Sequence, residues 1–326
     1  MRSSTRALVF AAAAACAGAA AAQAYDITTL DPPQSYFTII PFGINAAGTV
    51  TGVWVDPGQV DHGFLAAGGA FSSFDAPQAD TTKVIGVRGT WAGGIDDAGT
   101  VVGVYTAGGA QHGFVRDAAG TTTTLDIAGH LHTQLFAIND NGVVLGAYAD
   151  GDSVYGGTSF LRSAAGTLTT IAMPGASFTE GEGLNDTGAV VGGWIDAAGA
   201  VHGFERSASG VYTTIDVAGA DATIPSGINA AGWIVGEYDI GNVSHGYVQD
   251  PLGRVTTVDV PGAAFTSGTA INAAGVLVGQ YCDGADICHG FVATPVPEPA
   301  SALLAVAGAA LLGWRRRHAV REGGLR

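Results

Sequence analysis

Apolar and polar positions repeat along the chain in six copies of one pattern, each with the two-residue alternation of short β-strands. Each copy opens with an aliphatic residue, an Asn or Asp, two further residues and a Gly, as in Ile228-Asn229 to Gly232. Asn or Asp caps the first position of a β-turn, and Gly at the fourth accepts a positive φ. The pattern therefore predicts a tight turn between antiparallel strands in every copy. The turn Asn or Asp residues are Asn45, Asp96, Asn139, Asn185, Asn229 and Asn272.

Three more strands follow each turn. The next strand reads apolar, apolar, Gly, variable, aromatic, and its aromatic residues are Trp54, Tyr105, Tyr148, Trp194, Tyr238 and Tyr281. The third strand carries His-Gly-Phe or a variant, beginning at His62, His112, His202, His245 and His289, with Thr158 in the third copy. A fourth strand, such as Thr122 to Ile127, closes each copy except the last, which stops after Val292.

Four short strands per copy, with turns about 45 residues apart, match the size of a propeller blade. The stretch from Asp26 to Asp31 resembles the fourth strand that the last copy lacks. Pairing it with the last copy would close a ring and remove an open sheet edge. We therefore expect residues 25–295 to form an all-β, six-bladed β-propeller of four-stranded repeats, with the N-terminal strand completing the last blade.

Charge narrows the range of partners. Between Tyr25 and Pro295 there are 26 acidic and 6 basic residues, a net charge of −20. Such a surface repels nucleic acid phosphates and anionic membranes. We expect no nucleic-acid partner.

Residues 1–24 have the features of a secretory signal peptide: two early arginines, an Ala-rich apolar run and the cleavage pattern Ala22-Gln23-Ala24. Signal peptidase would cut before Tyr25. Cys16 raises the alternative of a lipoprotein, but the residues before it lack the large aliphatic side chain usual there. Export places the protein in an oxidising compartment.

Residues 296–326 begin with Val296-Pro297-Glu298-Pro299, continue with an apolar stretch to Trp314 and then carry Arg315-Arg316-Arg317. The stretch is shorter than the roughly 20 residues that span a bilayer comfortably, and an ordinary C-terminal anchor is the plain alternative. The order of features resembles the PEP-CTERM sorting signal of Gram-negative bacteria. The resemblance implies transient inner-membrane anchoring by a short transmembrane helix, processing by an exosortase and delivery to the cell surface or an exopolysaccharide matrix.

From Ile44 to Val292 the copies also resemble the HAF-type extracellular repeats, whose motif stands here as His-Gly-Phe. The shared residues are mostly turn and packing residues. The resemblance implies an extracellular location and a repeat fold, and it implies no activity.

The repeated histidines suggest a metal site, but ligands of one metal must converge within a few ångströms, and equivalent positions of a ring lie far apart. We expect each His to bond a neighbouring turn. His130 and His132, two residues apart, leave zinc as an alternative there, although no third ligand is near in sequence. The repeated Trp and Tyr residues could stack on sugars, but we expect them to pack between blades.

Carboxylates are plentiful, and a glycosidase needs only two. Glu180 and Glu182 precede the fourth turn, but abundance makes no carboxylate specific, and we assign no catalytic residue. Arg116, Arg162 and Arg206 are dispersed over successive copies, which disfavours a sialidase-type site. No nucleophile elbow, zinc-protease, P-loop or CxxC motif is present. We expect no cofactor or metal, with calcium in an Asp-rich loop as an alternative.

Cys282 and Cys288 are the only cysteines of the expected mature chain. They flank the loop between the second and third strands of the last copy. Antiparallel neighbours bring such ends close, so we expect a disulfide that pins the ring-closing blade.

The stretch from Gln78 to Trp91 breaks the period, since the first two turns lie 51 residues apart and the others 43 to 46. Insertions at a blade edge often carry specificity. Lys83, Arg88 and Trp91 in this stretch are therefore the candidate residues for an acidic glycan, with a plain surface loop as the alternative.

Together these observations predict an exported cell-surface or matrix protein with a binding or structural role, without catalysis and associated with an exopolysaccharide. A purely structural coat component with no soluble ligand is a further alternative. Exosortase and signal peptidase are its expected partners during export. The competing prediction is a secreted glycan hydrolase or lyase with carboxylates at the propeller mouth.

Overall fold

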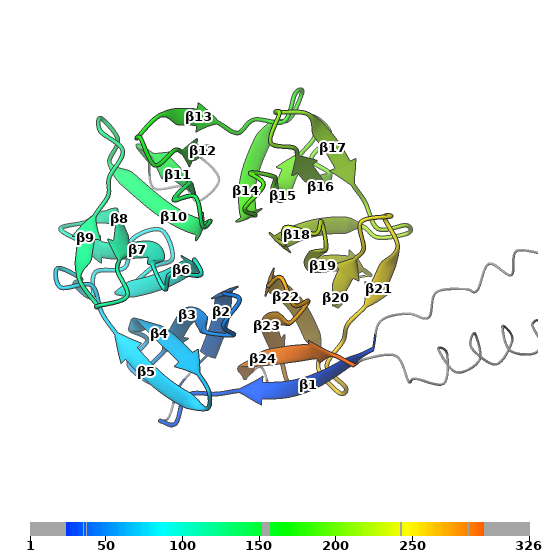
Figure 1. Cartoon of the computed structure of the whole chain (residues 1–326), viewed down its shortest axis with the longest axis horizontal. Coiled ribbons are helices and arrows are strands. Elements are labelled where there is room, and N and C mark those ends of the chain that lie inside the picture. The colour runs from blue at the N-terminus through cyan, green and yellow to red at the C-terminus, as the bar shows by residue number, and fades with distance from the viewer. Residues whose placement is uncertain are drawn as a thin grey trace, which may run out of the picture.

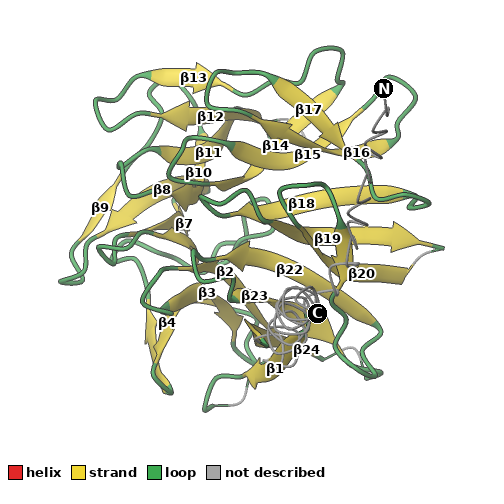
Figure 2. Cartoon of the chain, turned by 45° about the vertical axis from the view of Figure 1, so that its right-hand side comes forward, coloured by secondary structure: helices red, strands yellow, loops and turns green. Residues whose placement is uncertain are grey.

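The computed structural model describes residues 24–34, 36, 38–151, 157–241, 243–285 and 287–296, and within these ranges the chain contains strands and no helix. The sheets stand around a central axis (Figure 1), and the oblique view shows their edges joined by short loops (Figure 2). The all-β propeller architecture predicted from the repeats is confirmed.

The strands fall into four positions from the centre of the ring outward. The innermost strands are β2 (Thr38–Ile44), β6 (Thr90–Ile95), β10 (His132–Ile138), β14 (Phe178–Leu184), β18 (Ala222–Ile228) and β22 (Phe265–Ile271). The second strands are β3 (Val50–Val55), β7 (Val101–Ala107), β11 (Val144–Ala149), β15 (Val190–Ile195), β19 (Ile234–Ile240) and β23 (Leu277–Cys282). The third strands are β4 (Asp61–Ala67), β8 (Ala110–Arg116), β12 (Thr158–Arg162), β16 (Val201–Arg206), β20 (Val243–Gln249) and β24 (Cys288–Pro295). The outermost strands are β5 (Ala70–Phe74), β9 (Thr122–Thr124), β13 (Leu168–Thr170), β17 (Tyr212–Ile215), β21 (Val255–Thr257) and β1 (Tyr25–Leu30).

The sheets correct one prediction. Four of them are separate four-stranded blades, namely β6–β9, β10–β13, β14–β17 and β18–β21, whereas the other eight strands form one sheet in the order β22-β23-β24-β2-β3-β4-β5, with β1 beside β24. The prediction of a six-bladed propeller of four-stranded repeats is therefore wrong, because only four of the sheets among the described residues are four-stranded blades. The reason is a parallel pairing of Thr38 with Cys288, which joins the first and last copies into one hydrogen-bonded sheet.

The predicted pairing of the N-terminal strand with the last copy is confirmed. β1 runs antiparallel to β24, from Tyr25 opposite Pro295 to Leu30 opposite Gly290. The Val296 N–H also donates to the Ala24 carbonyl at 2.9 Å. The two ends of the described chain thus lie side by side on the seam that closes the ring (Figure 1).

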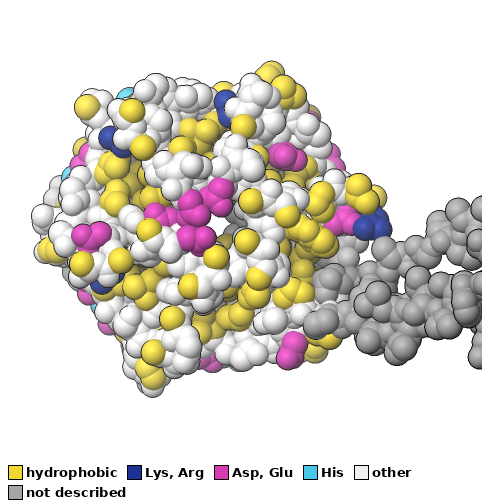
Figure 3. Space-filling view, viewed as in Figure 1, with side chains coloured by type: hydrophobic (Ala, Val, Ile, Leu, Met, Phe, Trp, Pro, Cys, Tyr) yellow, Lys and Arg dark blue, Asp and Glu magenta, His cyan; other side chains and the backbone are white. Residues whose placement is uncertain are grey.

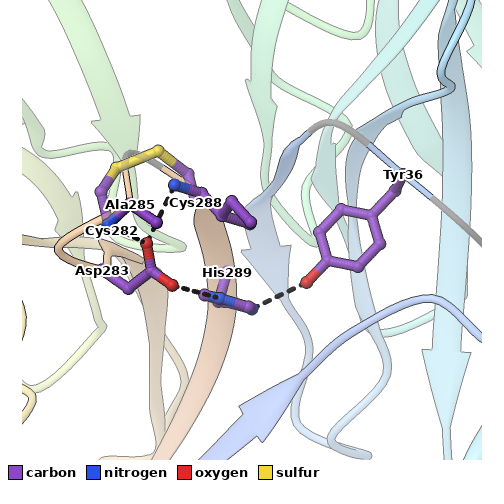
Figure 4. The surroundings of a disulfide bond; sticks show 7 residues. Tyr36, Cys282, Asp283, Ala285, Cys288 and His289 are labelled. Atoms are coloured by element: carbon purple, nitrogen blue, oxygen red, sulfur yellow. Dashed lines mark hydrogen bonds and ion pairs between the residues drawn. A yellow bond between two sulfur atoms is a disulfide. The ribbon is translucent and has the colours of Figure 1, made fainter.

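A disulfide lies next to this seam. Cys282 and Cys288 are register partners on β23 and β24, their Cα atoms are 4.0 Å apart, and their sulfurs are bonded. The neighbouring His289 lies between Asp283 and Tyr36 (Figure 4), and its Nδ1 is 2.7 Å from the Tyr36 hydroxyl. The N-terminal segment is therefore held to the last copy by side chains as well as by the strand ladder.

The aromatic residue of each His-Gly-Phe motif packs in the core. These residues are among the largest fully buried side chains, and they are Phe64, Phe114, Phe160, Phe204, Tyr247 and Phe291. The second-strand Gly makes room for them: a Cβ on Gly52 would lie 2.8 Å from the Phe64 ring and 2.1 Å from the Ile40 carbonyl oxygen. Close packing of ring on backbone explains why both residues recur in the copies.

The turn Asn residues form a chain of hydrogen bonds around the axis. The Asn139 side-chain amide donates to the Asn185 carbonyl at 2.9 Å, that of Asn185 to Asn229 at 3.0 Å, and that of Asn229 to Asn272 at 3.0 Å. Asn272 in turn donates to the Asn45 carbonyl at 3.1 Å, across the closure. Asp96 has no amide to donate, so the second copy interrupts this pattern. The turn residue thus links neighbouring copies in addition to capping its own turn.

Replacing Asn185 by Asp tests this link, since the change keeps the shape of the side chain and removes the donor to Asn229. It removes one of the two hydrogen bonds that the Asn229 carbonyl accepts, leaving the one from the Gly232 N–H, and it adds a charge, so we expect a loss of about 1–3 kcal/mol in the free energy of unfolding. Urea denaturation measures it. Asp96→Asn is the matched control, because it supplies a donor where the chain lacks one, and it should leave stability equal or higher. Equal loss in both variants would contradict the link.

The predicted signal peptide and most of the sorting signal lie outside the described residues. Ala24 and Val296 are described, whereas Ala22, Pro297, Glu298, Pro299, Arg315, Arg316 and Arg317 are not. Among the described residues, none belongs to a helix with the length and apolar character needed to cross a membrane.

Candidate functional site

Each innermost strand contains a β-bulge three residues before its turn Asn or Asp. Between β2 and β3, for example, the register passes from Pro41 opposite Gly52 to Gly43 opposite Thr51, which leaves Phe42 outside the ladder. A bulge bends its strand and re-aims the extra side chain. The residues placed in the bulges are Phe42, Gly93 with Gly94, Phe136, Glu182, Ser226 and Thr269.

All six bulges contribute to the wall of one cavity of about 420 Å³ in the centre of the ring. Residues two positions earlier on three of the strands, Trp91, Gln134 and Glu180, also line it. These are positions at which the copies differ, unlike the turn and packing positions. The cavity is therefore chemically asymmetric although the ring that surrounds it is built from repeats.

One side of the cavity is aromatic. Phe42 from β2 and Trp91 from β6 stack with ring centroids 5.9 Å apart and an interplanar angle of 25°, and Phe136 from β10 lies in the same wall. Trp91 Nε1 is buried and has no hydrogen-bond partner in the described part of the chain. A buried donor without an acceptor costs about 1–3 kcal/mol, and the contact that Trp91 offers to the cavity is its ring.

The other side is acidic. Glu180 and Glu182 come from β14, and burial raises the pKa of Glu180 to about 7. Burial, followed by the charges of Glu180 and Glu237, raises the pKa of Glu182 to about 8. Burial likewise raises the pKa of Glu237 on β19, against a hydrogen bond from Ser267 that lowers it. Each side chain keeps some surface open to the cavity although it lies deep in the protein. At neutral pH Glu180 and Glu182 can therefore hold protons and act as hydrogen-bond donors.

The inserted stretch before β6 forms part of the cavity wall through Ile85, Gly86 and Val87. Val84 and Val87 bond each other across a tight turn, and Ile85 at its tip has a φ of 46°, which is strained for a β-branched residue. The buried Gln111 amide holds this turn by donating to the Val84 carbonyl at 2.8 Å, and Gln134 donates to Gln111. Side-chain hydrogen bonds thus hold this turn in place at the wall of the cavity.

The central cavity continues along the axis of the ring toward the Asn turns as a narrower channel. A belt of aliphatic residues lines both smaller spaces that follow, of about 70 and 100 Å³, and it consists of Ile44, Ile95, Ile138, Leu184, Ile228 and Ile271. Asp96, Asp97, Asp140 and Asp186 line the far end. Figure 3 shows acidic side chains gathered around the central opening of the face drawn there. The channel is therefore acidic at its narrow end as well.

The three residues predicted as a ligand loop separate in the structure. Trp91 lines the cavity, whereas Arg88 donates from Nε to the Thr81 carbonyl at 3.0 Å and from Nη1 to the Gly58 carbonyl at 2.9 Å. Lys83 is exposed and is not among the residues that line the cavity. The structure does not bring the two cations to the site, so the expected attraction of an acidic glycan has no support in this geometry.

The repeated histidines bond carboxylates, as the structural interpretation predicts. In five copies Nδ1 of the His lies 2.8 to 3.1 Å from an Asp at the end of the outermost strand, and these Asp residues are Asp75, Asp126, Asp216, Asp259 and, from the N-terminal segment, Asp31. A carboxylate only accepts, so Nδ1–H donates. Each imidazole also stacks on the second-strand aromatic, as His62 does on Trp54 at 4.7 Å. The motif fastens the outer strands of each copy.

The third copy, which has Thr158 in place of His, restores the same contacts from another segment. His130 stacks on Tyr148 at 3.9 Å and bonds Asp150 at 3.1 Å. His132 is buried, and its Nδ1 accepts the Gln111 backbone N–H at 3.1 Å. The two histidines thus have different partners, and among the described residues no group of three His, Cys, Asp or Glu side chains could hold a metal ion.

Sequence reasoning missed the bulge residues as a group. They stand three positions before each turn Asn or Asp and read Phe, Gly, Phe, Glu, Ser and Thr. The signal available in the sequence was this contrast between a position that varies from copy to copy and a nearby turn residue that is always Asn or Asp. Glu180 and Glu182 were noted only as two carboxylates among many. Their convergence with Trp91 depends on the closure of the ring.

Comparisons with known proteins support the fold. The chain is similar to a catalytically inactive virginiamycin B lyase from Staphylococcus aureus bound to quinupristin, with 10% identity, a TM-score of 0.50, and 84% of this chain and 100% of that chain covered. It is also similar to a gluconolactonase from Xanthomonas campestris, with 15% identity, a TM-score of 0.50, and 84% and 90% covered. A luciferin-regenerating enzyme matches with 11% identity, a TM-score of 0.52, and 84% and 96% covered. No family model and no curated protein matches the sequence. At these identities the likeness supports a propeller and no particular activity.

Proposed function

We propose that the chain is an exported cell-surface or matrix protein that binds a glycan group in its central cavity without catalysis. The observation that carries this proposal is the convergence of the six non-equivalent bulge positions on one cavity. Repeats that share their turns and packing residues but differ at the cavity wall build a scaffold around one specific site. The secretory and PEP-CTERM-like segments of the sequence support the cellular address, and an exosortase is the proposed processing partner.

The lining fits a sugar in chemical terms. Aromatic rings offer flat apolar faces, and carboxyl and amide groups bond hydroxyls, which together hold a polar ligand in a defined orientation. Phe42, Trp91 and Phe136 supply the faces, and Gln134 and Glu180 supply polar groups. A terminal residue of an exopolysaccharide would enter such a cavity as one sugar ring.

Substitution of Trp91 by Ala should weaken glycan binding about tenfold, which corresponds to about 1.4 kcal/mol. The physical reason is the loss of a stacking face. Glycan-array binding followed by calorimetry measures the change. Trp194→Ala is the matched control, because Trp194 stacks on His202 outside the cavity, and circular dichroism verifies that both variants are folded. Unchanged affinity in Trp91→Ala would refute the cavity as the binding site.

The alternative function is glycan hydrolysis or lyase chemistry. It is favoured by the two glutamates of raised pKa in the cavity, since one protonated and one ionised carboxyl group form a general acid and base. Incubation with candidate polysaccharides and chromatography of the products separates the two functions. Binding without product supports the binding protein, whereas turnover abolished by Glu180→Gln or Glu182→Gln supports the enzyme.

Processing during export is tested on the protein released from cells. Mass spectrometry should give an N-terminus at Tyr25 and a C-terminus within the Pro297-Glu298-Pro299 segment. Because Ala24 and Val296 are hydrogen-bonded neighbours, both cleavages would take place beside the same seam. An intact C-terminus on the surface protein would count against exosortase processing.

A further inference from the structure

The half-buried glutamates of the cavity differ from the buried carboxylates of the described chain in their side-chain partners. Asp61 accepts the Arg88 backbone N–H, and Asp250 is paired with the Arg254 side chain. In contrast, the side chains of Glu180 and Glu182 have no hydrogen bond or ion pair with a described residue. An unpaired carboxylate in an enclosed site is costly, and the cost disappears when a cation enters.

The protein offers no cation of its own at this place. None of the described residues that line the cavity is Lys or Arg. His132, which lines a small adjoining space together with Glu180, accepts the Gln111 backbone N–H at Nδ1. Glu237 and Asp239 nearby add negative charge. Once these glutamates are ionised, the described cavity lining supplies no counter-charge, so a cation from outside the chain would supply it.

The opposite wall suits an organic cation rather than a metal ion. Phe42, Trp91 and Phe136 face the same cavity as the two glutamates, and aromatic faces attract ammonium groups through their negative π-clouds. The cavity of about 420 Å³ is far larger than a metal ion needs and has room for a sugar-sized molecule. The net charge of the exported domain would also draw a cationic ligand toward the ring.

We propose that the central cavity recognises an ammonium group, with Glu180 and Glu182 as its counter-ions and Trp91, Phe42 and Phe136 as its aromatic wall. This inference rests on the proposed binding function and names its ligand class. The ammonium group has two sources, an amino sugar without its acetyl group in a polysaccharide, or a free small amine. Both sources share the chemistry that the cavity provides.

Calorimetry with the purified protein distinguishes these sources. The probes are a tetramer of glucosamine, the same tetramer fully N-acetylated, and tetramethylammonium as a small organic cation of permanent charge. We expect the glucosamine tetramer to bind at least tenfold more tightly than the acetylated tetramer, since acetylation removes the charge and leaves the sugar ring. Glu182→Gln should lose at least tenfold in affinity for the amine. Glu205→Gln, the same change on β16 outside the cavity, should bind as the natural protein does.

Proton release gives a second readout. The glutamates that hold protons in the empty cavity must lose them to pair with an ammonium group, so the affinity for tetramethylammonium, whose charge does not change with pH, should rise at least tenfold from pH 6 to pH 8. Calorimetry in buffers of different ionisation enthalpy should show protons released on binding. The groups that could contribute are Glu180, Glu182 and Glu237, with Asp239, His132 and Tyr148 on the strands packed around them. Glu182→Gln should release fewer protons, which assigns the effect to the cavity.

The outcomes separate the two proposals. Equal binding of the acetylated and free tetramers, or unchanged amine affinity in Glu182→Gln, overturns the ammonium site and leaves glycan binding in place. Binding of tetramethylammonium with no binding of any glycan supports the ammonium site and overturns the glycan function. Absence of binding by all three probes overturns the ammonium site.

Discussion

Removal of residues 25–31 should destabilise the whole domain, with a melting temperature lower by about 8–15 °C, equivalent to about 4–6 kcal/mol. β1 pairs with β24 over its full length, and Tyr25, Ile27 and Leu30 pack against the cores of the last and first copies. The deletion also removes Asp31 from His289. Because β24 would then present an open edge, we further expect association of the variant at high concentration. Differential scanning calorimetry and light scattering measure both effects.

A peptide of residues 25–31, added in trans, is the matched control for this deletion. It should bind the open edge of β24 and restore part of the lost stability, whereas a peptide of scrambled sequence should not. Asp31→Asn in the intact chain separates the side-chain contribution from the strand ladder, and it should cost no more than about 2 kcal/mol. An unchanged melting temperature in the deletion variant would contradict the closure of the ring by the N-terminal strand.

The sequence predicts the features that depend on local chemistry. The Asn-to-Gly spacing indicates the turns because turn geometry demands those residues, and Gly48, for example, has the expected positive φ of 78°. The likeness of Asp26–Asp31 to other fourth strands predicts the seam, because strands that repeat a pattern repeat a pairing. The adjacency of Cys282 and Cys288 follows because they end two antiparallel strands that are joined by a short loop. Each of these inferences needs only neighbours in sequence or equivalence between copies.

The features that the sequence did not predict depend on the ring as a whole. The number of separate sheets changes with one parallel pairing, Thr38 with Cys288, and alternation of apolar residues carries no information about it. A bulge shifts the register by one residue without changing strand propensity, so the direction of Glu182 could not be derived from the pattern. The inserted stretch does line the central cavity through its apolar turn and Trp91, whereas Arg88 bonds backbone carbonyls and Lys83 lies outside the cavity, and the period break carries no information about this arrangement.

The pH dependence of stability should report the buried glutamates directly. The pKa values of Glu180 and Glu182 are raised in the folded protein, to about 7 and about 8, above the ordinary value of 4.5. Between pH 4.5 and 8 the folded state therefore holds more protons than the unfolded state, so the free energy of unfolding falls as pH rises through this window. We expect a loss of about 2–4 kcal/mol between pH 5 and pH 8.5, measured by urea denaturation.

The double variant Glu180→Gln/Glu182→Gln should remove most of this slope. It should match the natural protein near pH 5 and exceed its stability by about 2–4 kcal/mol at pH 8.5, because neutral amides carry no charge to desolvate. Glu205→Gln should keep the natural slope. The aspartates of lowered pKa, such as Asp196 and Asp250, act below the ordinary value of 3.8 and so leave this window unaffected. Burial of Glu237 adds a residual slope of the same sign, which the triple variant with Glu237→Gln should remove. The opposite result is a natural protein whose stability stays level or rises from pH 5 to pH 8.5. It would show that the glutamates are hydrated and ionised. The cavity would then lack the unpaired acidic wall on which ammonium recognition depends.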